Sequence, residues 1–269
     1  MSGENMPAIT TAVNERLEEA VRARLAGWPA EWEGYHWPGY CYEHTLRVRA
    51  LALHLARIEG ADEDVVHVAA TLHDICKSAG AEHAGLGAAE ARQLLLDLAA
   101  DPDVRERACD AIASHCGDNT QSSPLESRVL GDADLIDANF GLVAVARFIT
   151  IRSGHNSPLP ETIRSLSEWL PRKDAFLEVL LTSSGRQVAR QRSARMHVFC
   201  DELLLSLQDP AATEGVTLFG LAGAIHRDRG RSPLGELVDT LGWQSGDVPD
   251  DPLVGAALRS LASEIAGLA

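Results

Sequence analysis

Long apolar runs, targeting signals and repeats are missing from this sequence of 269 residues. No apolar stretch approaches the roughly 20 residues that a membrane-spanning helix needs, and the N-terminus lacks the charged-then-apolar pattern of a secretory signal. No internal repeat, heptad array, low-complexity tract or glycine-rich phosphate loop is evident. We therefore expect a soluble cytoplasmic protein that is not associated with a membrane.

Cysteine and positive charge are also scarce. The five cysteines are odd in number and form no C-x-x-C motif, which suits free thiols in a reducing compartment. Lys and Arg number 24 against 39 Asp and Glu, so the formal net charge is −15. This excess of negative charge argues against a nucleic-acid backbone or an anionic membrane as the default partner.

What the sequence does contain is helical periodicity over most of its length. The pattern predicts helices at residues 8–26, 42–58, 65–77, 82–98, 102–115, 133–152 and 181–207. After residue 209 it loosens into short amphipathic pieces broken by Gly, Pro and Asp. We expect an all-α fold with an N-terminal helix at 1–27, a main domain at 28–209 and a helical extension at 210–269, which would be a cap or a homodimer contact.

Metal-binding residue types occur on the predicted buried faces of these helices. His73 and Asp74 are adjacent, and four further polar residues, His44, His83, His115 and Asp134, share a helical face with apolar side chains. Taken singly, such a His is more often a core residue bonded to a carbonyl, and such an Asp more often a helix N-cap. Burying all six is costly unless one partner satisfies several of them, and a metal ion would do so.

The same residues resemble the HD-domain metal-dependent phosphohydrolase superfamily, whose motif runs H…HD…D with extra histidines in members that hold two metals. The matching segments are H-T-L-R-V at 44–48, L-H-D-I-C-K at 72–77, E-H-A-G-L-G at 82–87, I-A-S-H-C at 112–116 and G-D-A-D-L-I-D-A at 131–138. The likeness extends over about residues 40–205, including L-L-T-S-S-G-R-Q-V-A-R-Q-R at 180–192. It implies that residues 28–209 are an HD-domain helical bundle.

The resemblance also implies a ligand set. One divalent ion, either Mg or a transition metal (Mn, Fe, Co, Ni or Zn), would be held by His44, His73, Asp74 and Asp134. A second ion would be held by His83 and His115, with Asp74 as the bridge.

Two positions qualify this ligand set. The A-D-x-L register of the family favours Asp134 over Asp132, which is expected to cap the helix instead. Cys116 stands where some two-metal members have a second adjacent His, so the number of ions, one or two, stays open.

Four residues are candidates for substrate contact. Lys77 leaves the same turn as His73 and Asp74, and Arg47 gives the H-x-x-R spacing; together with Asp74 they are the expected catalytic residues. Arg47 could instead lie on a solvated face. Trp37 and Tyr40 belong to an aromatic cluster at 28–42 that would either stack on a nucleobase or sugar or plug the end of the helical core.

The resemblance implies a hydrolase that releases phosphate from a nucleotide or another small phosphate ester, by attack of a metal-bound hydroxide on phosphorus. Two alternatives stay open. A branch of the superfamily uses two irons and oxygen to cleave or hydroxylate small molecules, and the six ligands could supply that site. A non-catalytic sensor that binds a nucleotide is the other alternative.

Overall fold

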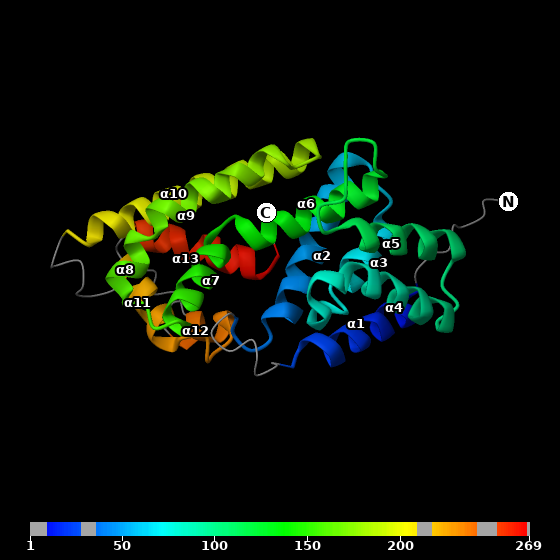
Figure 1. The fold of residues 1–269 in the computed structure, drawn as a ribbon, viewed down its shortest axis with the longest axis horizontal. Coiled ribbons are helices and arrows are strands. Elements are labelled where there is room, and N and C mark those ends of the chain that lie inside the picture. The colour runs from blue at the N-terminus through cyan, green and yellow to red at the C-terminus, as the bar shows by residue number, and fades with distance from the viewer. Residues whose placement is uncertain (1–9, 28–35, 209–216, 241–251, 268–269) are drawn as a thin grey trace. The chain divides into compact units, whose positions relative to one another are not determined.

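The computed structural model describes residues 10–27, 36–208, 217–240 and 252–267, which form helices joined by turns and loops and contain no strand (Figure 1). The predicted all-α fold class is confirmed. Among these residues, no helix combines the length with the apolar character that crossing a membrane requires.

The chain divides into two compact units. The first unit comprises Met1–Ala26, Cys41–Asp134 and Leu181–Gly185, and the second comprises Gly27–Tyr40, Leu135–Leu180 and Arg186–Ala269. Each unit is therefore assembled from segments that lie far apart in the sequence. The three consecutive parts expected above, 1–27, 28–209 and 210–269, stay a prediction about domains.

Helix packing in the first unit centres on α5. Its helices are α1 (Thr11–Leu25), α2 (Tyr40–Glu59, from Cys41 onward), α3 (Glu63–Leu72), the 3₁₀ helix η2 (Lys77–Glu82), α4 (His83–Asp97), α5 (Pro102–Ser114) and the first part of α6 (Leu125–Asn139). α5 packs against both α3 and α4 (Figure 1). Leu72, Leu95 and Ile112 of these three helices are fully buried, so the residues that end α3 and α5 are held on a rigid core.

The starts of α3 and α5 are set by side-chain caps. The Asp62 carboxylate accepts hydrogen bonds from the backbone amides of Asp64 and Val65. Asp101 caps α5 in the same way, and Pro102 occupies the first turn, where its missing N–H costs nothing.

The prediction of one helix over 65–77 is wrong beyond Leu72. The amide of Ile75 donates to the carbonyl of Leu72, and the amide of Lys77 donates to that of Asp74, so three-residue turns replace the α-helical pattern. His73 and Asp74 consequently lie in a tight turn at the end of α3.

The prediction of one helix over 133–152 is also wrong, because two helices occupy this range. α6 ends at Asn139 and α7 runs over Leu142–Gly154. Gly141 between them has φ 105°, a conformation that side chains with a Cβ rarely adopt. The Glu264 carboxylate accepts a hydrogen bond from the amide of Val143 and so satisfies the start of α7.

In the second unit, the C-terminal helices pack around α7. Its remaining elements are α8 (Leu159–Arg164), α9 (Leu166–Asp174), the 3₁₀ helix η3 (Ala175–Glu178), most of α10 (Ser183–Ser206), α11 (Leu218–Asp228), α12 (Leu234–Thr240) and α13 (Pro252–Ile265). Both α11 and α13 contact α7. The expected C-terminal extension is therefore helical over most of its described residues, 217–240 and 252–267.

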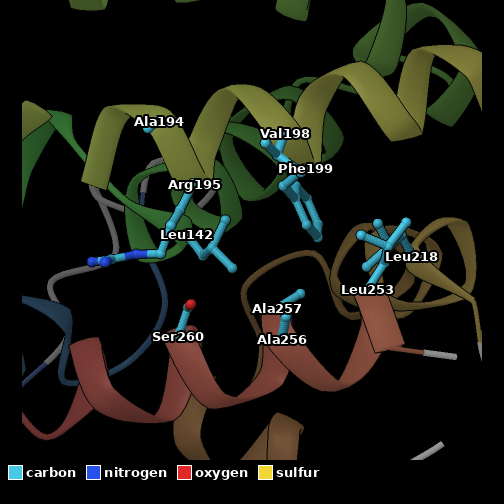
Figure 2. Close-up of a pocket in the computed structure, with 10 residues that line it drawn as sticks. All are labelled: Leu142, Ala194, Arg195, Val198, Phe199, Leu218, Leu253, Ala256, Ala257 and Ser260. Carbon is cyan, nitrogen blue, oxygen red and sulfur yellow. The ribbon is translucent and has the colours of Figure 1, made fainter. Parts of the chain in front are cut away.

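An apolar pocket of about 270 Å³ lies in the second unit. Figure 2 shows side chains of α10, such as Phe199, and of α13, such as Ala257, around it. Leu142 of α7 and Leu218 of α11 complete much of its lining. The pocket contains none of the residues singled out from the sequence.

Candidate metal centre

The first unit brings together a donor group from three elements. His44 on α2 and Asp134 on α6 lie with Nε2 and Oδ1 3.0 Å apart. His73, directly after α3, has its Nε2 4.0 Å from the same Asp134 oxygen. These three donors, which we call the first donor group, lie close enough together to hold one metal ion.

A second donor group lies beside the first. His83 at the start of α4 and His115 at the end of α5 have their Nε2 atoms 3.3 Å apart. The Sγ atom of Cys116 lies 3.2 Å from the Nε2 of His83 and 3.3 Å from that of His115. His83, His115 and Cys116 also lie close enough together to hold one ion.

Asp74 lies between the two donor groups. Its Oδ2 is 3.8 Å from the Nε2 of His44 and 3.6 Å from that of His73. Its Oδ1 is 3.2 Å from the Nε2 of His83 and 3.7 Å from that of His115. One carboxylate oxygen therefore faces each group, which is the arrangement of a bridging ligand.

Two of these buried atoms have no hydrogen-bond partner among the described residues. They are the Nε2 of His73 and the Oδ2 of Asp74, in side chains that are fully buried. Leaving such atoms unsatisfied costs free energy, whereas a bound cation would satisfy both at once. These two unsatisfied atoms show that the donor set suits a metal ion, and this conclusion does not depend on the resemblance to a family.

The backbone fixes which nitrogen of three histidines faces the centre. His73, His83 and His115 each follow the last residue of a helical segment, α3, η2 and α5 respectively. In each case Nδ1 lies within hydrogen-bond distance of a carbonyl three residues earlier, that of Ala70, Gly80 and Ile112, at 2.9, 2.6 and 2.6 Å. With Nδ1 as the donor, Nε2 is left to bind metal.

Burial and charge move the proton affinities of these groups in opposite directions. Burial lowers the pKa of His73 to about 4, so its imidazole is neutral at pH 7. Burial also disfavours the charged form of His115, but hydrogen bonds with Asp74 and Cys116 outweigh it and raise its pKa to about 10. Burial alone would raise the pKa of Asp74. The charge interaction with His73 and the hydrogen bonds with His115 and His83 outweigh burial and hold this pKa well below its usual range.

Lys77 is the predicted substrate residue that lies at the centre. Its Nζ atom is 3.0 Å from the Oδ1 of Asp74 and 3.5 Å from the Nε2 of His83. Burial opposes its charge, but Asp74 and Asp134 together raise its pKa, and 36% of its side chain is exposed. The ammonium group therefore stays charged, and part of the Lys77 side chain is exposed to solvent.

Arg47 does not lie on a solvated face, so that alternative is wrong. The residue is 3% exposed, and its guanidinium lies 3.9 Å from the Glu43 carboxylate, one turn earlier on α2. Its contact with substrate stays a prediction.

Trp37 and Tyr40 belong to the second unit. Both are buried; the Tyr40 ring meets the Trp37 ring edge-on and stacks on His36. The remaining aromatic residues of the predicted cluster before position 36 lie outside the described residues. A role of Trp37 and Tyr40 in substrate binding stays a prediction.

Asp132 is absent from both donor groups, but it does not cap its own helix as expected. It accepts hydrogen bonds from the amides of Leu181 and Thr182 and from the Thr182 hydroxyl, just before α10. Asp132 therefore fixes the start of a different helix, which sequence spacing alone did not indicate.

The helices of the first unit place one donor group of His44, His73 and Asp134 and another of His83, His115 and Cys116 around Asp74. The fold and the site therefore define a helical domain with a candidate metal centre. Residues 41–139 match the family model of the HD domain. This part of the chain is therefore similar to HD domains, and the resemblance predicted from the sequence is confirmed.

Two solved structures share this fold with low sequence identity to this chain. A predicted HD superfamily hydrolase from an uncultured Thermotogales bacterium is 24% identical with a TM-score of 0.52, over 72% of this chain and 92% of that one. YpgQ of Bacillus subtilis in complex with ADP is 20% identical with a TM-score of 0.55, over 74% of this chain and 96% of that one. No curated protein matches the sequence.

Proposed function

We propose that the protein is a metal-dependent phosphohydrolase that acts on a nucleotide or another small phosphate ester. The observation that carries the proposal is the position of Asp74, whose two oxygens face different donor groups. Two ions held on one carboxylate can stabilise both the attacking and the leaving oxygen of a phosphoryl transfer.

The residues that would hold the ions are those that converge in the first unit. His44, His73 and Asp134 would hold one ion and His83 with His115 the other, and Asp74 would bind both. Divalent ions bound there would supply an activated water and neutralise charge on the phosphate. Carbonyl acceptors behind three of the histidines keep the Nε2 atoms aimed at the centre without rearrangement.

Lys77 is proposed to bind a phosphate oxygen. Its charged ammonium lies beside Asp74 and its side chain reaches solvent, so it can contact an anion that enters the centre. Arg47 is proposed as a second phosphate contact.

Nucleoside diphosphates are the substrates to test first. The Bacillus subtilis protein with the same fold was crystallised with ADP, which supports a small phosphate ligand in this fold. The net charge of −15 also favours a small substrate over a nucleic-acid chain.

A phosphate-release screen over nucleotides and sugar phosphates, with each divalent metal, tests the proposal. We expect metal-dependent release that His73→Ala abolishes. His197→Ala is the matched control, because His197 pairs with Asp174 in the second unit and should be dispensable. Full activity of the His73→Ala variant would contradict the proposal.

The same preparation separates the two alternatives. Two irons per chain, oxygen uptake and no phosphate release would favour a diiron oxygenase, whose irons the shared carboxylate would equally suit. Tight nucleotide binding without turnover in the metal-loaded protein would favour a sensor.

A further inference from the structure

The second donor group contains the sulfur atom of Cys116, at a position where some two-metal members of the predicted superfamily have a second adjacent histidine. We propose that the Cys116 thiolate is a ligand of the second metal position and that this position selects a transition metal such as Zn²⁺, Fe²⁺ or Co²⁺ over Mg²⁺. The inference rests on the proposed metal centre but not on the phosphohydrolase reaction.

The distances around Cys116 place three donor atoms within reach of one ion. Its Sγ lies 3.2 and 3.3 Å from the two imidazole nitrogens, which are themselves 3.3 Å apart. Zinc bond lengths in a tetrahedral site put nitrogen ligands about 3.3 Å apart and a nitrogen and sulfur pair about 3.6 Å apart. The Oδ1 of Asp74, 3.2 Å from the Nε2 of His83, is the fourth donor.

Without metal, the thiol can donate a hydrogen bond to one of the two nitrogens that it contacts and accept one from the other. A metal ion would engage all three atoms together. Cysteine binds metal as the thiolate, and its proton would leave to solvent on binding.

The two donor groups differ in the metals that they favour. The first group offers two imidazoles and the Asp134 carboxylate, which suit many divalent ions. The second offers two imidazoles and a thiolate, and thiolate ligands favour Zn²⁺ and Fe²⁺ over Mg²⁺, which prefers oxygen. Cys116 therefore narrows the range of metals at one position only.

Exposure separates Cys116 from its two histidine neighbours. His83 and His115 are 8% and 4% exposed, whereas Cys116 is exposed. The thiolate would thus close the solvent side of the second position. Bound metal should protect Cys116 from alkylation, and removal of the metal should expose it.

Cobalt substitution tests the proposal without reference to activity. The metal-free, reduced full-length protein is titrated with Co²⁺ and followed by absorption spectroscopy. We expect a near-ultraviolet sulfur-to-cobalt charge-transfer band that Cys116→Ser abolishes, while circular dichroism shows an unchanged fold. Cys76→Ser is the matched control and should keep the band, since Cys76 is partly exposed but belongs to neither donor group.

Each outcome bears on one proposal or on both. A charge-transfer band that persists in Cys116→Ser, or cobalt bound to the wild type without such a band, would overturn the Cys116 assignment. A wild type that binds no cobalt would overturn the metal centre itself. A normal band without phosphate release from any substrate would leave Cys116 as a ligand and contradict only the phosphohydrolase proposal.

Mapping of alkylated cysteines by mass spectrometry gives a second measurement. Iodoacetamide should label Cys116 in the metal-free protein, and saturating Zn²⁺ should suppress this labelling while saturating Mg²⁺ should not. Equal labelling with both metals would contradict the proposed selectivity.

Discussion

At the scale of single residues, the candidate centre depends on where three histidines leave their helices. Each follows a helical segment and has Nδ1 beside a carbonyl three residues earlier. The carbonyls of Gly80 and Ile112 also accept the backbone amide of the same histidine. A carbonyl oxygen has two lone pairs, so it can accept from the imidazole as well and orient it. The same backbone geometry therefore aims three Nε2 atoms at Asp74.

The raised pKa of His115 predicts that metal binding depends on pH. A group with a pKa of about 10 carries a proton at pH 7 that must leave before Nε2 can bind metal. Metal affinity should therefore rise with pH in this range, by up to about tenfold per unit for this one proton. Calorimetric titration in buffers of different ionisation enthalpy measures the protons released.

The matched variant for this measurement is His115→Gln, which should release one proton fewer than the wild type. His73, with a pKa of about 4, is already neutral and should release none at pH 7. Equal proton release by the wild type and His115→Gln would contradict the assignment.

Sequence patterns could identify the six candidate ligands, because each lies on an apolar helical face or beside one that does. They could not show that Cys116 lies beside both His83 and His115, because Cys116 follows His115 directly and is not part of the spacing that marks the buried helix face. Nor could they place Asp132, whose hydrogen-bond partners before α10 lie about 50 residues away. Contacts between segments that are distant in the chain cannot be predicted from the local sequence pattern.

At the scale of elements, the break between α6 and α7 depends on two residues far apart in the chain. A Cβ added to Gly141 would overlap the Glu264 carboxylate, and φ at Gly141 is 105°. Helical periodicity runs through this position without interruption, which is why one helix was expected there. The break requires the C-terminal helix α13, which supplies Glu264.

Gly141→Ala should therefore destabilise the protein, by about 2 to 4 kcal/mol from backbone strain and overlap combined. The matched control is Gly235→Ala in α12, where an added Cβ meets nothing within 4 Å. That substitution should be neutral or stabilising by up to about 1 kcal/mol. Denaturant unfolding measures both; equal stability of the two variants would show that the carboxylate does not restrict Gly141.

Glu264 predicts a dependence of stability on pH. Burial raises its pKa despite the nearby Arg192, so the folded protein holds this proton more tightly than the unfolded chain does. By linkage, its contribution to the free energy of unfolding is largest at acid pH and declines as pH rises above the ordinary value of 4.5. Glu264→Gln, which keeps an acceptor for Val143, should remove this decline.

Unfolding of the wild type and of Glu264→Gln at pH 4.5 and at neutral pH is the measurement. Glu264→Ala should in addition lose about 1 to 3 kcal/mol at both pH values, because the buried amide of Val143 is left without an acceptor. An identical pH dependence in the wild type and Glu264→Gln would contradict the account.

At the scale of the whole molecule, both donor groups belong to the first unit and the pocket of Figure 2 belongs to the second. The all-α class and the helices within 217–240 and 252–267 follow from periodicity and could be predicted. The division into units could not, because it depends on how α7 packs with α11 and α13.

Metal binding should stabilise the first unit. An ion at about 100 times its dissociation constant adds about 2.7 kcal/mol, which corresponds to a melting temperature higher by about 5 to 10 °C. Calorimetry with metal and with excess chelator measures the difference. If the units unfold separately, only one transition should move; a chelator that leaves every transition unchanged would contradict metal binding to the folded chain.

The shared carboxylate is the central claim, and Asp74→Asn tests it most directly, since the amide keeps the size of the side chain but loses its charge. Metal content by elemental analysis and phosphate release are measured on the same preparation of variant and wild type. The account predicts that the variant loses bound metal and phosphate release together while its circular dichroism is unchanged. A variant that keeps the metal content and turnover of the wild type would contradict it.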